Sequence, residues 1–87
     1  MIPYDFSKYA RNQFKKLPKI EQKRIIKKLE FFLGTQNPLA FAKFIRREGG
    51  IPVYRFRIGN WRIIFDWEVK SIFVTEIRPR KFKRIYK

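Results

Sequence analysis

The sequence predicts an α+β fold, in which an N-terminal strand and a two-helix hairpin pack on one face of a small antiparallel β-sheet. Two observations predict this fold. Apolar residues recur at helical spacing up to Gly34, whereas after Gly50 they alternate with other residues as in a strand. The chain has 87 residues, which is enough for one domain only. We therefore expect residues 1–87 to form a single domain with a largely aromatic and aliphatic core.

The N-terminal segment predicts a short strand followed by a helix. "MIPYDF" alternates large apolar residues with others, and Pro3 would keep such a strand near a sheet edge. Ser7 is a favourable N-cap for the helix that follows. Ala10, Phe14 and Leu17 are spaced to lie on one face of that helix.

A second helix is predicted for "KIEQKRIIKKLEFFL", between Pro18 and Gly34. Pro18 breaks the first helix and suits the first turn of the next, so the two should form a helical hairpin. Gly34 is a plausible stop just beyond the helix. The predicted buried stripe consists of Ile25, Ile26, Leu29, Phe32 and Leu33. We expect Lys23, Lys27 and Lys28 to form a solvated face rather than a binding site.

The second half of the chain predicts strands. Asn37-Pro38 and Gly49-Gly50 break the chain, and "AKFIR" between them suits a short strand. Three clearer strands follow, over residues 51–58, 61–67 and 71–77. Gly59-Asn60 is a favoured two-residue hairpin turn, with glycine where a type II′ turn needs it. These strands should form an antiparallel meander.

The charge of the chain points to an anionic partner. It has 22 Lys and Arg against 7 Asp and Glu, a net charge of +15 that opposes compaction. Nucleic acid is the first candidate and a membrane surface the second. The absence of Cys and His excludes disulfides and Cys/His metal sites, and the dispersed carboxylates do not suggest a metal-dependent nuclease. With no long apolar run or secretory signal, we expect a cytoplasmic protein without a membrane partner or a cofactor.

"YRFRIGNWRIIF" gives the predicted hairpin two different faces. A two-residue turn sets Ile58 opposite Trp61 and Arg57 opposite Arg62, and opposed residues share a face of the sheet. Arg55 lies on the same face as Arg57 because side chains alternate along a strand. The other face is apolar and should receive the helices; its members are Tyr54, Phe56, Ile58, Trp61, Ile63, Phe65 and Trp67.

The opposed arginines have two interpretations. Like charges directly opposite one another destabilise a hairpin, by somewhat below about 1 kcal/mol in water. In one interpretation the arginines splay apart, cover the sheet and use Asp66 or Glu76 as counter-ions. In the other, which we favour, Arg55, Arg57 and Arg62 form a clamp for phosphate oxygens, and a bound phosphate relieves the repulsion.

The C-terminal segment "RPRKFKRIYK" adds six basic residues in ten positions. The residues of this segment expected to contact the nucleic acid are Arg78, Lys81, Lys83 and Arg84. Alternation along the last strand puts Glu76, Arg78 and Arg80 on one side, but the preceding turn decides whether that is the arginine side. Because apolar residues interleave the basic ones, we expect this segment to fold back onto the sheet rather than form a disordered tether.

Taken in order, "FSKYARNQFKKLPKIEQKRIIKKLEFF", "YRFRIGNWRIIF" and "RPRKFKRIYK" resemble the RelE/ParE toxin superfamily of prokaryotic toxin–antitoxin systems. The similarity covers nearly the whole chain. RelE-like members enter the ribosomal A site and cleave the mRNA there, by transfer from a ribose 2′-OH to the adjacent phosphate. The resemblance therefore implies a RelE-like fold and a metal-independent endoribonuclease, or mRNA interferase. It implies the ribosome, mRNA and a cognate antitoxin protein as partners.

The resemblance also implies roles for five residues. Arg55 and Arg57 match the two basic strand positions and would neutralise charge at the scissile phosphate. Arg62 would stabilise the transition-state phosphorane, and Arg80 would assist the departing 5′-oxygen. Tyr86 matches the C-terminal tyrosine, as a base or a stacking partner for a flanking nucleotide; the alternative is a packing residue that anchors the tail. A tyrosine base needs nearby cations to lower its pKa, and the arginines could supply them.

Two other functions stay open. A ParE-like toxin would share the fold but inhibit DNA gyrase and cleave no RNA. Such a protein does not need a phosphate clamp, so the four arginines of the predicted catalytic site argue against it. A catalytically inactive RNA-binding relative is the second alternative, and the sequence does not separate it from the nuclease.

Overall fold

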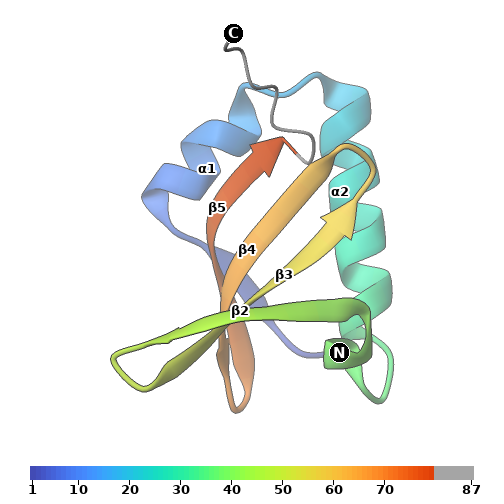
Figure 1. Ribbon diagram of the computed structural model, residues 1–87. Helices are drawn as coiled ribbons and strands as arrows, with labels where there is room; N and C mark the ends of the chain where they lie inside the picture. The colour runs from blue at the N-terminus through green and yellow to red at the C-terminus, as the bar shows by residue number, and fades with distance from the viewer. Residues whose placement is uncertain (80–87) are drawn as a thin grey trace, which may run out of the picture.

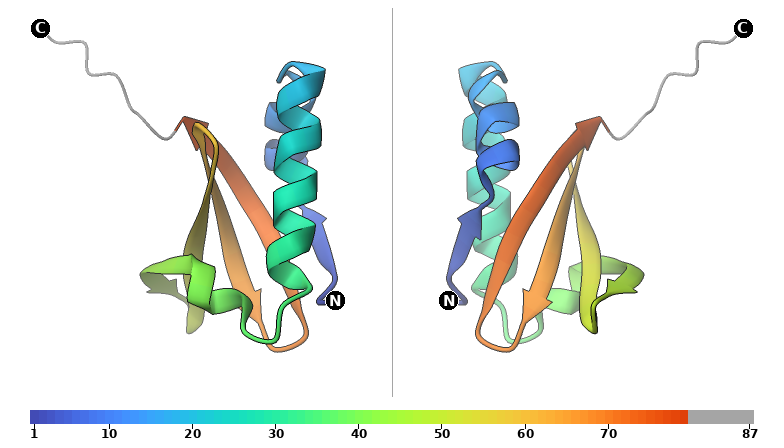
Figure 2. Two further views of the ribbon diagram at one scale, coloured as in Figure 1. Left: turned by 90° about the vertical axis from the view of Figure 1, so that its right-hand side faces the viewer. Right: turned by 90° about the vertical axis from the view of Figure 1, so that its left-hand side faces the viewer.

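The computed structural model describes residues 1–79 and has two layers. Two helices cover one face of a twisted five-stranded sheet (Figures 1 and 2), as predicted. Among the described residues, no helix is long and apolar enough to cross a membrane. The elements in chain order are β1 (Tyr4–Phe6), α1 (Lys8–Lys15), α2 (Lys19–Leu33), the 3₁₀ turn η1 (Pro38–Phe41), β2 (Ala42–Glu48), β3 (Ile51–Ile58), β4 (Trp61–Glu68) and β5 (Ser71–Pro79).

The strand order is β1-β5-β4-β3-β2. Strands β2 to β5 form the predicted antiparallel meander, and "AKFIR" belongs to its edge strand β2. β1 pairs with β5 in parallel, so the complete sheet is mixed. β1 has only three residues, which limits the unpaired edge that it leaves open.

The predicted helix boundaries at Ser7, Pro18 and Gly34 are confirmed, but α1 ends at Lys15, so Leu17 lies beyond the helix and not on its face as predicted. The backbone N–H of Ala10 donates to Ser7 Oγ at 3.0 Å, so Ser7 is the N-cap of α1. Pro18 immediately precedes α2, and the helix ends before Gly34. Gly34 has a φ of −89°, so it ends the helix in an ordinary right-handed conformation rather than a left-handed one.

Two glycine turns shape the meander. Gly59 has a φ of +60°, and no described residue other than glycine has a positive φ, which fits a type II′ turn at Gly59-Asn60. The resulting register sets Ile58 opposite Trp61 and Arg57 opposite Arg62, as predicted. Between β2 and β3, Gly49 and Gly50 both have positive φ, so two L side chains there would be strained.

The core lies between the helix stripes and the predicted apolar face of the sheet. The ring of Phe56 packs 4.7 Å from that of Phe32 on α2 and 4.6 Å from that of Phe65 on β4. No polar or charged side chain is buried within the described part of the chain. The buried core residues are Ala10, Ile25, Leu29, Phe32, Leu33, Phe56, Ile58, Ile63, Phe65, Ile72, Val74 and Ile77.

Candidate nucleic-acid interface

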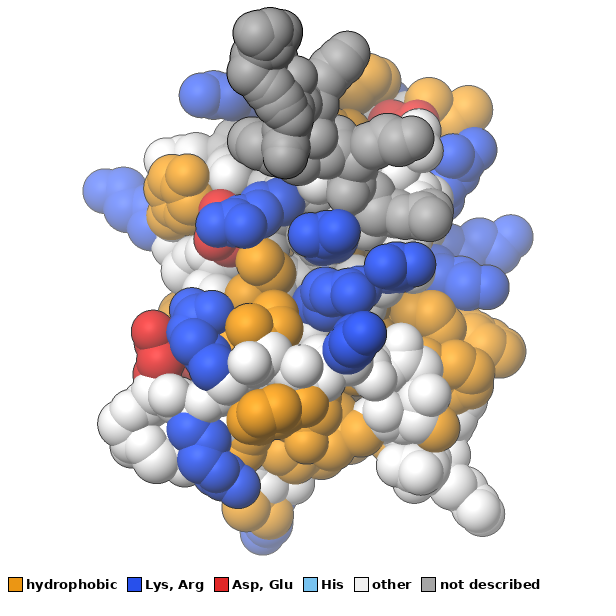
Figure 3. Space-filling view, viewed as in Figure 1, with side chains coloured by type: hydrophobic (Ala, Val, Ile, Leu, Met, Phe, Trp, Pro, Cys, Tyr) orange, Lys and Arg blue, Asp and Glu red, His pale blue; other side chains and the backbone are white. Residues whose placement is uncertain are grey.

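Three arginines form a row across the face of the sheet that the helices leave uncovered. β3, β4 and β5 place Arg57 opposite Arg62, and Arg62 opposite Arg78. We call these three residues the arginine row. Side chains that are directly opposed have Cβ atoms about 4.5–5.5 Å apart, so three guanidinium groups start from neighbouring points of one surface. Figure 3 shows the basic side chains gathered on this face, over the middle strands of the sheet.

A second row of side chains crosses the same face one step further along the strands. It consists of Lys43, Arg55, Ile64 and Glu76, on β2 to β5 in that order. Ile64 is only 7% exposed, which indicates that the long side chains beside it cover the sheet. The interpretation in which the long side chains cover the sheet is therefore correct for their alkyl stems. It does not exclude the phosphate clamp, because the guanidinium groups at the ends of these stems can still converge.

Lys43 was not among the residues predicted to contact RNA. Counting regularly back from the turn at Gly49 and Gly50 would set Lys43 opposite Phe56, on the core face. The register shifts between Phe44 and Arg46, so Lys43 lies opposite Arg55 instead. A β-bulge adds one residue to a strand, and one residue is enough to move a side chain to the other face.

A second bulge decides the position of Arg78. Regular pairing from the turn between β4 and β5 would set Glu76 opposite Ile63, inside the core. The register shifts between Ile64 and Phe65, so that Glu76 lies opposite Ile64 and Arg78 opposite Arg62. Glu76 and Arg78 therefore lie on the same side of the sheet, as predicted, and this is the face that carries Arg57 and Arg62.

Counter-ions neutralise little of the arginine row. Arg78 Nε lies 2.7 Å from Glu76 Oε2, so this arginine has one of the two expected carboxylates. Within residues 1–79, no ion pair includes Lys43, Arg57 or Arg62. Arg62 Nε is buried and has no hydrogen-bond partner in the described part of the chain.

Asp66, the other expected counter-ion, does not pair with the row. It lies on the same face, opposite Val53 and Phe73. Burial raises the pKa of its carboxyl group, as do the neighbouring Glu48 and Glu68 carboxylates, whereas Arg46 lowers this pKa. Within residues 1–79, Asp66 forms no ion pair with Arg57 or Arg62, so it does not serve as their counter-ion.

Hydrogen bonds to the helices hold the strands beside two of the arginines. Trp61 Nε1 donates to Glu21 Oε1 on α2 at 3.1 Å, one position before Arg62. The backbone N–H of Ile77 donates to Gln13 Oε1 on α1 at 2.7 Å, one position before Arg78. The row is therefore carried by strands that are attached to both helices, which favours a preorganised surface.

A groove of about 290 Å³ continues the basic surface past Arg57 toward η1. Phe41 is 45% exposed at this groove, and its ring stacks on that of Phe32 at 4.7 Å. The lining residues are Ala40, Phe41, Ala42, Lys43, Arg55 and Arg57. Cations beside an exposed aromatic ring can bind a phosphate together with a nucleobase. Phe41 was missed as well, because η1 was not predicted.

The structure brings together Arg55, Arg57, Arg62 and Arg78 of the predicted site residues. The remaining predicted site residues lie outside the described part of the chain; they are Arg80, Lys81, Lys83, Arg84 and Tyr86. The expected folding of this segment onto the sheet lies outside it as well. In the described part of the chain, no cluster of three or more His, Cys, Asp or Glu side chains could hold a metal ion.

Comparisons with known proteins identify the fold. No protein-family model and no curated protein sequence matches this chain. Among solved structures, a chain of the archaeal RelE–RelB complex from Pyrococcus horikoshii OT3 superposes with a TM-score of 0.71 and 23% identity, over 91% of this chain and 94% of that one. A chain of the toxin–antitoxin complex RelBE2 from Mycobacterium tuberculosis superposes with a TM-score of 0.72 and 22% identity, over 91% of this chain and 98% of that one. This chain has the RelE fold. The fold expected from the sequence resemblance is thus confirmed over nearly the full length.

Within this RelE fold, the opposed arginines predict a variant that is more stable than the natural protein. Replacing Arg57 by glutamine should raise the free energy of unfolding by roughly 0.2–1 kcal/mol, because it removes the like charge opposite Arg62. Urea denaturation at low ionic strength measures this gain. Added salt should reduce it, since salt screens the repulsion in the natural protein.

A matched control for this measurement is Arg11→Gln on α1. It removes the same charge, but Arg11 Nη2 lies 3.6 Å from Asp5 Oδ1, so the variant loses a weak attraction instead. The stability of Arg11→Gln should be unchanged or slightly lower. If both variants change stability equally, only the net charge matters, and the repulsion within the arginine row is refuted.

Proposed function

We propose that this protein is the toxin of a toxin–antitoxin system and that it cleaves mRNA in the ribosomal A site. The observation that carries the proposal is the position of Arg55, Arg57 and Arg62 on one face of the sheet, with Arg57 directly opposite Arg62. The RelE fold supports the toxin role, since the similar structures are described as RelE–RelB and toxin–antitoxin complexes. A cognate antitoxin is accordingly the proposed protein partner, and the cytoplasm, where ribosomes translate, is the proposed place of action.

In the proposed reaction, a ribose 2′-oxygen forms a bond to the adjacent phosphorus, and the bond from phosphorus to the 5′-oxygen breaks. Negative charge builds up on the non-bridging oxygens in the transition state. Guanidinium groups already held on a sheet can stabilise this charge without reorganising. We assign this role to Arg62, which lies between Arg57 and Arg78 on the uncovered face of the sheet. Arg55 and Arg57 bind the scissile phosphate in the ground state.

The reaction also needs a base for the 2′-OH proton and a cation that assists the departing 5′-oxygen, which then takes its proton from water. The chain has no histidine, so we assign these roles, as the sequence resemblance implies, to Tyr86 and Arg80. A high local density of cations favours the phenolate form of a tyrosine. Tyr4 is a poor candidate, because burial and its hydrogen bond to Glu30 raise its pKa to about 12.

The groove beside η1 extends the proposed RNA path. Lys43 and Arg57 line it, and Arg57 also belongs to the arginine row. A nucleotide next to the scissile phosphate can place its own phosphate against Lys43 and its base against Phe41. We therefore expect Lys43→Ala to weaken binding of the message with less effect on the chemical step.

The decisive experiment incubates the purified protein with ribosomes translating a defined mRNA and maps the new 5′ ends. We expect cuts within the A-site codon, and none when the same mRNA is supplied without ribosomes. Expression in cells should stop growth, and co-expression of the cognate antitoxin should restore it. Absence of cuts together with inhibition of gyrase supercoiling would instead support a ParE-like toxin. Salt-sensitive RNA binding without any cleavage would support an inactive relative.

A further inference from the structure

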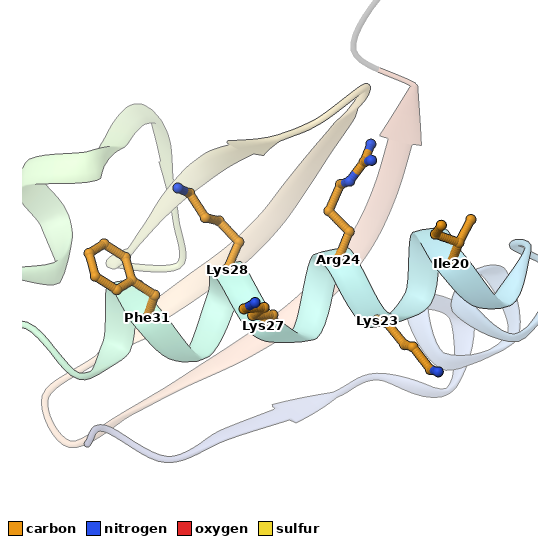
Figure 4. A pocket seen from close by; sticks show the side chains of 6 residues that line it. All are labelled: Ile20, Lys23, Arg24, Lys27, Lys28 and Phe31. Carbon is orange, nitrogen blue, oxygen red and sulfur yellow. The ribbon is translucent and has the colours of Figure 1, made fainter.

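Helix α2 has a second stripe, on the side opposite its core residues, that forms a shallow hollow of about 490 Å³ (Figure 4). Ile20 lies near one end of the hollow and Phe31 at the other, and they are 68% and 57% exposed. Three helical turns separate them, or about 16 Å. Four cations lie between them along the helix; these are Lys23, Arg24, Lys27 and Lys28.

The four cations repel one another in the free protein. Lys23 and Lys27 are four positions apart on the helix, as are Arg24 and Lys28, and like charges at this spacing destabilise a helix. Arg24 has one weak counter-ion, since its Nη1 lies 3.8 Å from Glu21 Oε1. The lysines lie in no ion pair among the described residues. As in the arginine row, an anionic partner would relieve this repulsion.

The surface between the charged ends is apolar. Lys28 Nζ lies 5.4 Å from the centre of the Phe31 ring, so its ammonium group lies over an aromatic face. The stems of the other long side chains complete the lining. A ligand for this hollow must therefore bury apolar groups at both ends and present negative charges between them.

We propose that this hollow binds an acidic amphipathic helix of a protein partner, with apolar residues that reach Ile20 and Phe31 and carboxylates that face the four cations. This inference rests on the proposed function, which supplies the antitoxin as that partner. RNA fits less well, because a base could stack on Phe31 but Ile20 would be left without a partner. α2 belongs to the layer on the other side of the sheet from the arginine row (Figure 2). Occupying the hollow would accordingly anchor the partner without covering the row.

The test uses the full chain and a fluorescent helical peptide of roughly 16 residues, close to the length at which helices form alone in water. The peptide has leucines three turns apart with glutamates between them on the same face, and a scrambled version is the control. We expect binding of the designed peptide only. The double variant Lys23→Glu/Lys27→Glu should weaken it at least about tenfold, and Ile20→Ala should weaken it several-fold. Circular dichroism checks that these exposed positions leave the fold intact.

A matched variant on the other face separates the two surfaces. Arg57→Gln/Arg62→Gln should leave peptide binding unchanged and weaken binding of a single-stranded RNA oligonucleotide, whereas the α2 double variant should leave most RNA binding in place. Equal binding of the scrambled peptide, or no effect of Lys23→Glu/Lys27→Glu, would overturn the proposal. Loss of RNA binding in the α2 variant, with peptide binding retained, would make the hollow an RNA surface and overturn it as well.

If the proposed function is wrong but the docking surface is right, the two experiments give a different combination of results. The natural protein would then give no cuts on translating ribosomes, while the designed peptide still bound to α2. Conversely, cuts at the A site without peptide binding would leave the nuclease in place and refute the docking surface.

Discussion

Replacing Arg62 by alanine is expected to lower the rate of ribosome-dependent mRNA cleavage about 10²–10³-fold, the usual cost of removing one preorganised donor from a developing oxyanion. Arg62 lies between Arg57 and Arg78, so it is the central donor of the arginine row. Single-turnover cleavage on ribosomes with a defined A-site codon measures the effect. Binding to the ribosome should change much less, because many other cations contribute to it.

Two controls separate chemistry from charge and from folding. Arg11→Ala on α1 removes the same charge from the helix layer and should retain the natural rate. Arg62→Lys keeps the charge but loses the planar fork that binds two phosphate oxygens, so we expect an intermediate rate. A folded Arg62→Ala variant that cleaves at the natural rate would show that the arginine row has no part in the transition state.

Replacing Phe56 by alanine is expected to lower the free energy of unfolding by about 3–5 kcal/mol. Phe56 is 0% exposed, and its ring lies between those of Phe32 and Phe65, at 4.7 and 4.6 Å. Domains are usually stable by only about 5–15 kcal/mol, so this variant would be marginal. Urea denaturation or calorimetry measures the loss, which corresponds to a fall in Tm of roughly 4–8 °C for each kcal/mol.

Phe44→Ala is the matched control for this prediction. Phe44 is 50% exposed on the edge strand β2, and its ring meets that of Tyr54 at 5.5 Å. Removing it should cost less than about 1.5 kcal/mol, the upper range for an aromatic pair. Equal losses in the two variants would contradict a core centred on the contact between α2 and the sheet.

Local sequence signals determined most of the fold and the centre of the candidate site. The helix cap at Ser7, the break at Pro18 and the turn at Gly59-Asn60 act through residues next to them in the chain, and each has the expected effect. The turn alone sets the register of the hairpin. For that reason the opposition of Arg57 and Arg62 could be predicted, together with the apolar face behind them.

The tertiary structure alone decided which other residues join the site. Along β5 the buried residues are Ile72, Val74 and Ile77, and the step of three between the last two breaks the two-residue period of a strand. A bulge absorbs the extra residue, because regular pairing would bury Glu76 against Ile63 and expose Ile77. The free energy gained by burying Ile77 and leaving the Glu76 carboxylate in water arises only when the helices pack on the sheet. It is therefore not visible in the local sequence. In β2, the bulge between Phe44 and Arg46 likewise places Lys43 opposite Arg55. The local sequence does not specify where a strand takes up an extra residue, so this position could not be predicted.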